Sequence, residues 1–225
     1  MFQKILIANR GEIAVRIIRA CREMGIKTVA VYSEADRDAL HTLLADEAIC
    51  IGPAPSTESY LDMERILTAC VVMKADAIHP GFGFLSENAR FAELCEKCNI
   101  RFIGPSAEII NKMGNKSEAR KTMMAAGVPV VPGSKEPVYT VEEGLKTAKE
   151  VGFPVMIKAS SGGGGKGMRV SRSEEDFEAN FLNAQMESVK GFSDNTMYIE
   201  RFVENPRHIE FQILGDRYGN VVHLG

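Results

Sequence analysis

The chain has 225 residues, of which 45% are hydrophobic, and its 27 Lys and Arg against 30 Asp and Glu give a net charge of −3 at pH 7. A hydrophobic content of this size can fill one large core or two small ones, which excludes disorder as the main state. The near balance of charge provides no basic field, so we expect no nucleic-acid partner.

The N-terminal segment is too short to predict a signal core or a membrane span. Its apolar run covers only residues 5–8 before Asn9 and Arg10, against the ~20 residues that a membrane helix needs. The five cysteines are an odd number spread over a long chain, a pattern typical of reduced thiols. Cys95 and Cys98 form a CxxC pair without a second such pair, so we interpret them as ordinary helix thiols. We therefore expect a cytoplasmic chain with no membrane partner.

Up to about residue 103, short β-rich runs alternate with helical periods. We predict strands at residues 4–8, 27–32, 48–51, 75–79 and 101–103. We predict helices at residues 11–24, 59–73 and 87–98. In the first helix, Ile13, Ile17, Cys21 and Met24 share the apolar face. This βαβ rhythm indicates an α/β, Rossmann-like domain over residues 1–104, with a parallel sheet and helices on both faces.

A helical linker is predicted after this domain, at residues 105–130. Asn115 and Glu118 form a capping box at the start of a helix, and Gly127 and Pro129 end it. An α+β lobe follows at residues 131–203.

Within this lobe, Thr140 and Glu143 repeat the capping device before a helix that Gly152 and Pro154 end. Three strands, at residues 155–158, 168–170 and 197–202, and a long helix at residues 174–189 complete the lobe. Residues 204–225 are assigned to the start of a further, truncated lobe, in which arms at residues 207–214 and 220–224 form a hairpin.

A glycine run at residues 162–167 has five glycines in six positions. Each glycine costs about 1 kcal/mol of extra ordering entropy if the loop is fixed. A flexible linker is one interpretation, but strands flank the run on both sides, which favours a loop whose backbone N–H groups bind phosphate. The dinucleotide fingerprint requires a following helix, and the Walker A pattern requires Ser or Thr after Lys166, where Gly167 stands.

What remains is a strand, a glycine-rich flap and a strand, the arrangement of protein kinases and ATP-grasp enzymes, and the kinase HRD and DFG motifs are absent from the sequence. Lys116 begins a helix and Lys158 ends the strand before the flap, so the two lysines can clamp a nucleoside triphosphate. We expect the apolar strand to bury Lys158 unless it has an anionic partner.

Long segments of the sequence resemble biotin carboxylases, the ATP-grasp subunit or domain of acetyl-CoA, propionyl-CoA and pyruvate carboxylases. The resemblance rests on the flap and on residues 7–14, 77–88, 102–105, 113–116 and 204–210. It covers the whole chain but only about the first half of a family member. The resemblance implies a Rossmann-like pre-ATP-grasp domain followed by the nucleotide-flap lobe of an ATP-grasp domain.

The resemblance also implies which residues bind the nucleotide. Contacts to the ATP phosphates are implied for Lys116, Lys158, Gly164 and Gly165. Recognition of adenine through backbone groups is implied for Glu200, Arg201, Phe202 and Val203, and contact with the ribose side is implied for His208. The segment from His79 to Asn88 would border the biotin pocket, with Phe82 where most members carry Tyr. The family's catalytic and magnesium-binding residues lie in the second half, so we assign none here.

By the same resemblance, the intact enzyme would use ATP, Mg²⁺ and bicarbonate to form carboxyphosphate and then carboxylate biotin on a carrier protein. A biotin carboxyl carrier and a carboxyltransferase would be its partners. It would form a homodimer through Arg16, Arg19 and Glu23, and the 225-residue chain alone would be inactive. Two alternatives stay open: another ATP-grasp ligase such as carbamoyl phosphate synthetase, which would lack the segment at residues 79–88, and a noncatalytic nucleotide-binding or dimerisation module.

Overall fold

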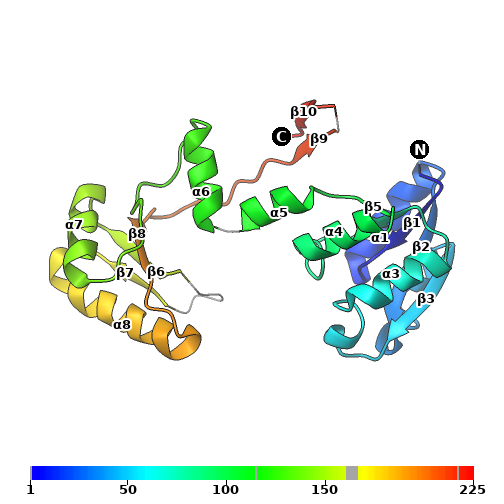
Figure 1. Cartoon of the computed structure of the whole chain (residues 1–225), viewed down its shortest axis with the longest axis horizontal. Helices are drawn as coiled ribbons and strands as arrows, with labels where there is room; N and C mark the ends of the chain where they lie inside the picture. The colour runs from blue at the N-terminus through cyan, green and yellow to red at the C-terminus, as the bar shows by residue number, and fades with distance from the viewer. Residues whose placement is uncertain (1, 115, 161–166, 217) are drawn as a thin grey trace. The chain divides into compact units, whose positions relative to one another are not determined.

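The computed structural model describes residues 2–114, 116–160, 167–216 and 218–225 (Figure 1). The chain divides into two compact units, Met1–Val128 and Pro129–Gly225, each with its own sheet and core. The division falls inside residues 128–134, a stretch of the chain without helix or extended strand. The four-part division into residues 1–104, 105–130, 131–203 and 204–225 stays a prediction.

The first unit is built on a five-stranded parallel sheet with the strand order β3-β2-β1-β4-β5. The strands are β1 (Lys4–Ile7), β2 (Lys27–Ser33), β3 (Glu47–Gly52), β4 (Ala77–His79) and β5 (Arg101–Phe102). The predicted α/β class and parallel sheet are confirmed. Because β1 and β4 are neighbours, the direction of chain progression across the sheet reverses between them.

Helices cover both faces of this sheet, as predicted. They are α1 (Gly11–Glu23), α2 (Leu40–Leu44), α3 (Met63–Val72) and α4 (Ala89–Lys97), with short 3₁₀ turns η1 (Glu34–Asp36) and η2 (Ser56–Glu58). Alternate residues of β1 supply the two cores: Ile5 and Ile7 pack with α1, and Leu6 packs with α3 and α4. Each such fully buried side chain contributes about 1.5–3 kcal/mol through removal from water.

Two predicted helix starts were too early, because side-chain caps set the boundaries. The Asp62 carboxylate accepts a hydrogen bond from the Arg65 N–H at 3.0 Å and starts α3 after it. The Asn88 side chain does the same for α4, accepting from the Phe91 N–H at 2.9 Å. Met24 was wrongly placed on the buried face of α1: it is the C-cap residue and is 59% exposed.

The first unit ends in two further helices, α5 (Ala107–Gly114) and α6 (Lys116–Ala125). The sequence patterns indicated one helix here, and α5 was missed. Asn115, the residue of the predicted capping box, lies outside the described residues.

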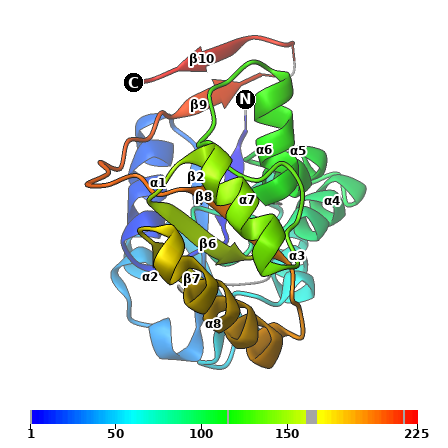
Figure 2. The same ribbon diagram turned by 90° about the vertical axis from the view of Figure 1, so that its left-hand side faces the viewer.

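The second unit carries a three-stranded antiparallel sheet with the order β7-β6-β8. Its strands are β6 (Val155–Ala159), β7 (Met168–Ser171) and β8 (Met197–Arg201). The helices α7 (Val141–Val151) and α8 (Glu174–Phe192) lie over one face of the sheet (Figure 2). The predicted capping box at Thr140 and Glu143 is present.

The last strands, β9 (Ile213–Gly215) and β10 (Val221–His223), form an antiparallel pair. The predicted hairpin exists, but its arms are shorter than expected, since residues 207–212 form no strand. The side chains of both strands are exposed. A two-stranded pair without a covered face is marginal by itself, which explains why the longer pairing does not form. Among the described residues, no helix is long and apolar enough to span a membrane.

Candidate nucleotide site and the edge of the parallel sheet

The sheet of the second unit has one covered face and one open face. In β6, Val155 and Ile157 are fully buried against α7 and α8, whereas Met156 and Lys158 alternate with them and are only partly buried. The strand register places Met156 opposite Glu200 and Lys158 opposite Tyr198, on the same open face. A lysine and a glutamate therefore stand side by side on a surface that the helices of this unit leave free.

Lys158 is paired with a protein carboxylate. Its ammonium group forms an ion pair with Glu200 Oε1 across the β6–β8 boundary, and the two side chains are 36% and 30% exposed. We expected the strand to bury Lys158 unless it had an anionic partner, and Glu200 is such a partner. The strand is apolar on its covered face alone, so the lysine keeps access to water and to a ligand.

The base of the glycine flap lies directly beside Lys158. The Ala159 N–H donates to the Gly167 carbonyl at 2.9 Å, and the Gly167 N–H donates to Glu187 Oε2 at 3.1 Å. Gly167 has φ +70°, and a Cβ at this position would lie 2.8 Å from the Ala159 Cβ, so only glycine fits this close approach. The predicted phosphate contacts Gly164 and Gly165 lie outside the described residues.

The segment predicted to read adenine forms the end of β8 and the residues after it. The Arg201 N–H donates to the Pro132 carbonyl at 2.8 Å, and the Phe202 N–H donates to the Pro154 carbonyl at 2.9 Å. Backbone recognition of a base would therefore use other main-chain groups of residues 200–203. Val203 is 50% exposed.

The remaining predicted contacts, His208 and Lys116, belong to other segments of the chain. His208 is in an exposed segment and has its Nε2 3.4 Å from Glu210 Oε1, with the imidazole 84% exposed. Lys116 is the first residue of α6 in the first unit, and its side chain is outside the described part of the structure. The structure thus brings Lys158 and Glu200 together within one unit.

A second polar cluster lies in the first unit, where β1 and β4 end side by side. Asn9 follows β1 and is 3% exposed. Its side-chain nitrogen donates to the carbonyls of Pro80 and Phe82, both at 2.7 Å. In open α/β sheets, ligands bind outside the carboxyl ends of strands at such a reversal of strand order. Asn9 was not predicted as part of a site, because its hydrogen-bond partners are more than 70 residues away in the sequence.

Arg10 extends this cluster. Its guanidinium lies 5.3 Å from the ring centre of Tyr60 and 5.6 Å from that of Phe84, and the two rings stack 5.0 Å apart. Arg10 also pairs with Asp36 at 3.2 Å. Burial alone would raise the pKa of the Asp36 carboxyl, but hydrogen bonds from Tyr60, Ser33 and Arg10 outweigh it and hold that pKa below its ordinary value.

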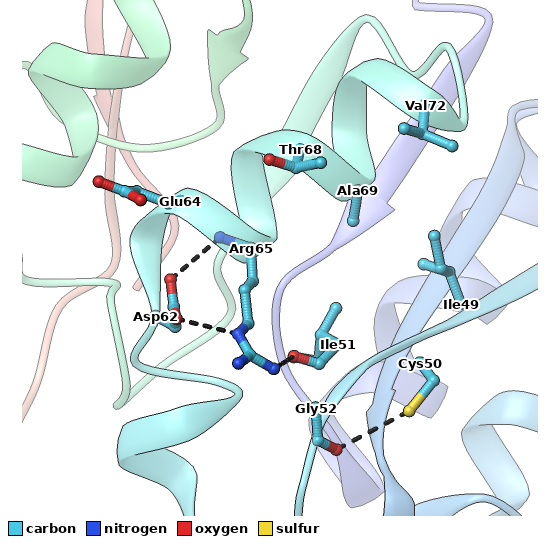
Figure 3. Close-up of a pocket in the computed structure, with 10 residues that line it drawn as sticks. All are labelled: Ile49, Cys50, Ile51, Gly52, Asp62, Glu64, Arg65, Thr68, Ala69 and Val72. Atoms are coloured by element: carbon cyan, nitrogen blue, oxygen red, sulfur yellow. Dashed lines mark hydrogen bonds and ion pairs between the residues drawn. The ribbon is translucent and has the colours of Figure 1, made fainter.

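A cavity of about 630 Å³ lies between β3 and α3 in the same unit (Figure 3). Arg65 lines this cavity, and its guanidinium already has protein partners: it forms an ion pair with Asp62 and donates a hydrogen bond to the Ile51 carbonyl at 3.2 Å. Among the residues that the structure describes, none of those predicted to bind nucleotide lines this cavity. Within the described part of the chain, no three His, Cys, Asp or Glu side chains are arranged to hold a metal ion.

Comparisons with known proteins show which family has this sequence and architecture. The profile of the biotin carboxylase N-terminal domain matches residues 1–110, and that of the carbamoyl-phosphate synthase L chain ATP-binding domain matches residues 115–225. A biotin carboxylase from Nostoc sp. (strain PCC 7120) is 60% identical over the whole chain. The chain belongs to the biotin carboxylase family. The match of residues 1–110 separates it from the carbamoyl phosphate synthetase alternative, which shares the ATP-binding domain.

Two solved biotin carboxylases have the same fold. A biotin carboxylase complex with β,γ-ATP from Campylobacter jejuni is 53% identical over 99% of this chain, with a TM-score of 0.87. The biotin carboxylase domain dimer of Hydrogenobacter thermophilus 2-oxoglutarate carboxylase, solved with MgADP, ADP and bicarbonate, is 53% identical over 100% of the chain, with a TM-score of 0.85. The chain spans about half the length of these biotin carboxylases and of the Nostoc relative, 49–50% in each case.

Proposed function

We propose that the whole protein carboxylates biotin on a carrier protein, using ATP, Mg²⁺ and bicarbonate with carboxyphosphate as the intermediate. The family membership supports this reaction. The main structural observation in favour of ATP binding is the open face of the β6–β8 sheet. There a lysine of partial exposure stands at the base of the glycine flap. A triphosphate needs countercharge and backbone N–H donors. Lys158 would supply the first, and the glycine run next to it in the sequence would supply the second.

Within this proposal, the nucleotide lies on the open face with its phosphates toward the flap. Lys158 releases Glu200 or shares its charge with the γ- or β-phosphate, and Lys116, Gly164 and Gly165 complete the phosphate contacts. The main chain of residues 200–203 binds adenine, and His208 reaches the ribose. Closure of the flap excludes water, because carboxyphosphate is lost to hydrolysis in a wet site.

Magnesium fits this chain poorly. The described residues offer no group of three metal-ligating side chains, so the ion would be held by other parts of the whole protein. When bound there, it would neutralise phosphate charge.

We further propose a homodimer, a biotin carrier and a carboxyltransferase as partners, and a cytoplasmic location. On α1, Arg16, Arg19 and Glu23 are all exposed, which leaves them free for an interface in which Arg19 of one copy meets Glu23 of the other. The five free cysteines suit a reducing compartment.

The reaction is tested with the protein expressed from its complete coding sequence. Transfer of ¹⁴C from bicarbonate to free biotin, dependent on ATP, is the expected result. Bicarbonate-dependent ATP cleavage that requires ammonia in place of biotin would instead favour a carbamoyl phosphate synthetase.

The 225-residue chain alone gives a second test. Compared with a control carrying both Lys116→Ala and Lys158→Ala, it should release no additional ADP when bicarbonate is added. Stimulated release above that control would contradict our assignment of the remaining catalytic groups to other parts of the protein.

A further inference from the structure

The segment after β4, residues 80–86, is held in a conformation that side chains rarely adopt. Gly81, Gly83 and Phe84 have φ of +64°, +68° and +42°. For the two glycines this region is accessible, but a bulky residue such as Phe84 is strained there by about 1–3 kcal/mol. Such strain persists only where surrounding contacts fix the backbone, and it gathers at functional sites.

Asn9 supplies the first of these contacts. Its single side-chain nitrogen donates to the carbonyls of Pro80 and Phe82, so both of its N–H bonds are used on one short segment. Its Oδ1 accepts from the Arg10 N–H at 2.9 Å, which completes the hydrogen bonding of the amide group. The fit is close: a Cβ on Gly81 would lie 2.9 Å from the Asn9 nitrogen. A buried amide of this kind is stable only while its partners stay in place.

Arg10 supplies the second contact, through aromatic rings. It lies over Tyr60 and the strained Phe84, and Tyr60 is fully buried and donates its hydroxyl to Asp36 at 2.7 Å. Asp36 in turn pairs with Arg10. Phe84 is therefore held in a three-way contact with a buried ring and with a cation that is itself anchored.

Phe82 lies in sequence between Gly81 and Phe84, within the segment that these contacts hold. Its carbonyl is bound by Asn9, yet its side chain is 61% exposed, at the carboxyl edge of the sheet where β1 and β4 end. An exposed aromatic ring on a backbone that is fixed by hydrogen bonds and by the packing of a nearby residue is preorganised to contact a flat ligand at little entropic cost.

We propose that Asn9 and Arg10 are positioning residues: they hold residues 80–86 so that Phe82 is presented to the ring system of the biotin substrate. The choice of ligand rests on the proposed function, whereas the positioning itself rests on the contacts within the first unit. Neither residue touches substrate in this proposal, since each acts through the segment that it holds.

The positioning is tested by a reporter that needs no activity. The 225 residues contain no tryptophan, so Phe82→Trp introduces a single indole into this chain. The fluorescence of any tryptophan elsewhere in the whole protein is subtracted by measuring the parent protein. In this background, Asn9→Asp replaces the two N–H donors with a carboxylate oxygen. That oxygen can only accept hydrogen bonds, so it faces the carbonyls of Pro80 and Phe82 without a donor. The same change at exposed Asn99 is the matched control.

We expect Asn9→Asp to lower the fluorescence anisotropy and increase acrylamide quenching at position 82, with Asn99→Asp unchanged. Arg10→Gln should act in the same direction, and because Arg10 is about half exposed, this variant tests the proposal even if Asn9→Asp does not fold. Unchanged anisotropy and quenching in the folded variants would overturn the positioning role.

The kinetic arm uses the protein from the complete coding sequence, without the tryptophan. Asn9→Asp or Arg10→Gln should raise KM for biotin by about three- to tenfold, the effect of losing one or two neutral contacts, and leave KM for ATP unchanged. Equal increases in both KM values would indicate a general structural effect and contradict positioning. If the parent protein does not carboxylate biotin at all, the proposed function fails, while the reporter still decides whether Asn9 and Arg10 hold the segment.

Discussion

The ammonium group of Lys158 pairs with the carboxylate of Glu200 across the boundary between β6 and β8, on the face of the sheet that the helices leave open. The pair is about one-third exposed, so water screens it and its net contribution to stability is small. A lysine held in this way is charged, oriented and still able to meet an anion. The carboxylate keeps the lysine in place when no nucleotide is bound.

The first prediction concerns the stability of this pair. Lys158→Gln and Glu200→Gln should each change the free energy of unfolding by less than about 1 kcal/mol, because the pair is partly exposed. Urea unfolding followed by circular dichroism measures this. A loss of 3 kcal/mol or more, the range of about 3–5 kcal/mol typical of a broken buried pair, would show that Lys158 is a structural charge.

Stability should also depend on pH through two histidines of the first unit. Burial lowers the pKa of His41 and of His79, so both are neutral in the folded protein where an unfolded histidine, with a pKa of about 6.5, begins to bind protons. Their contribution to stability is full above that value and is lost as the pH falls below it. We expect the free energy of unfolding to decrease between pH 7.5 and 5.5.

The variant His41→Leu tests this assignment. It should reduce the slope of unfolding free energy against pH, whatever its effect on stability at pH 7.5. The same comparison with His223→Leu, at an exposed position of the second unit, should leave the slope as in the parent protein. Equal slopes for all three proteins would contradict the role of His41.

The five cysteines should divide into two classes by reactivity. Cys50 and Cys98 are exposed, whereas Cys21, Cys70 and Cys95 are buried. Burial raises the pKa of Cys70 to about 11 and that of Cys95 to about 12; Asp76 and a neighbouring thiol add to the first effect, and two neighbouring thiols add to the second. Since the thiolate is the reactive form, iodoacetamide should label two sites rapidly in the native chain.

The remaining three thiols should react only after unfolding in guanidinium. Mass spectrometry of peptides from native and unfolded samples distinguishes the two classes. Rapid native labelling of Cys95 would show that the end of α4 opens readily, in conflict with its place in the core.

For the proposed dimer, the decisive change is a charge reversal on α1. Arg19→Glu should shift the protein from its complete coding sequence toward monomer in sedimentation experiments, because Glu23 of the partner copy would then face a like charge. Adding Glu23→Arg to Arg19→Glu should restore the dimer. Lys97→Glu on α4 is the control for a reversed surface charge. The same mass for parent and Arg19→Glu would remove this stripe from the interface.

Much of the fold followed from local patterns. Alternating runs and helical periods gave the strands and the longer helices, because each element buries its own apolar face. Short or unsupported elements did not follow: the five residues of α2 carry too little periodicity, and residues 207–212 have strand-like composition without a second strand to pair with. Propensity alone does not decide such segments.

The site was predictable only where one segment carried the signal. The glycine run and Lys158 stand together in the sequence, but the covering of one face of β6 depends on where α7 and α8 pack, so the pairing of Lys158 with Glu200 could not be predicted. Asn9 was missed for a related reason. Its importance depends on the adjacency of β1 and β4, and a βαβ rhythm does not specify strand order.

The central claim is that a nucleotide binds the open face of the β6–β8 sheet through Lys158. The most direct test of this claim is a measurement of ATP affinity. The control is Lys149→Gln, which breaks a similar pair, with Glu174 at 2.7 Å, between α7 and α8 on the covered side of the sheet. By calorimetric titration of the protein from its complete coding sequence, Lys158→Gln should weaken ATP binding by roughly ten- to a hundredfold, the equivalent of about 1.5–3 kcal/mol for a charge-assisted contact, while Lys149→Gln binds as the parent does. Parental ATP affinity in Lys158→Gln, in a protein that binds ATP, would contradict the claim.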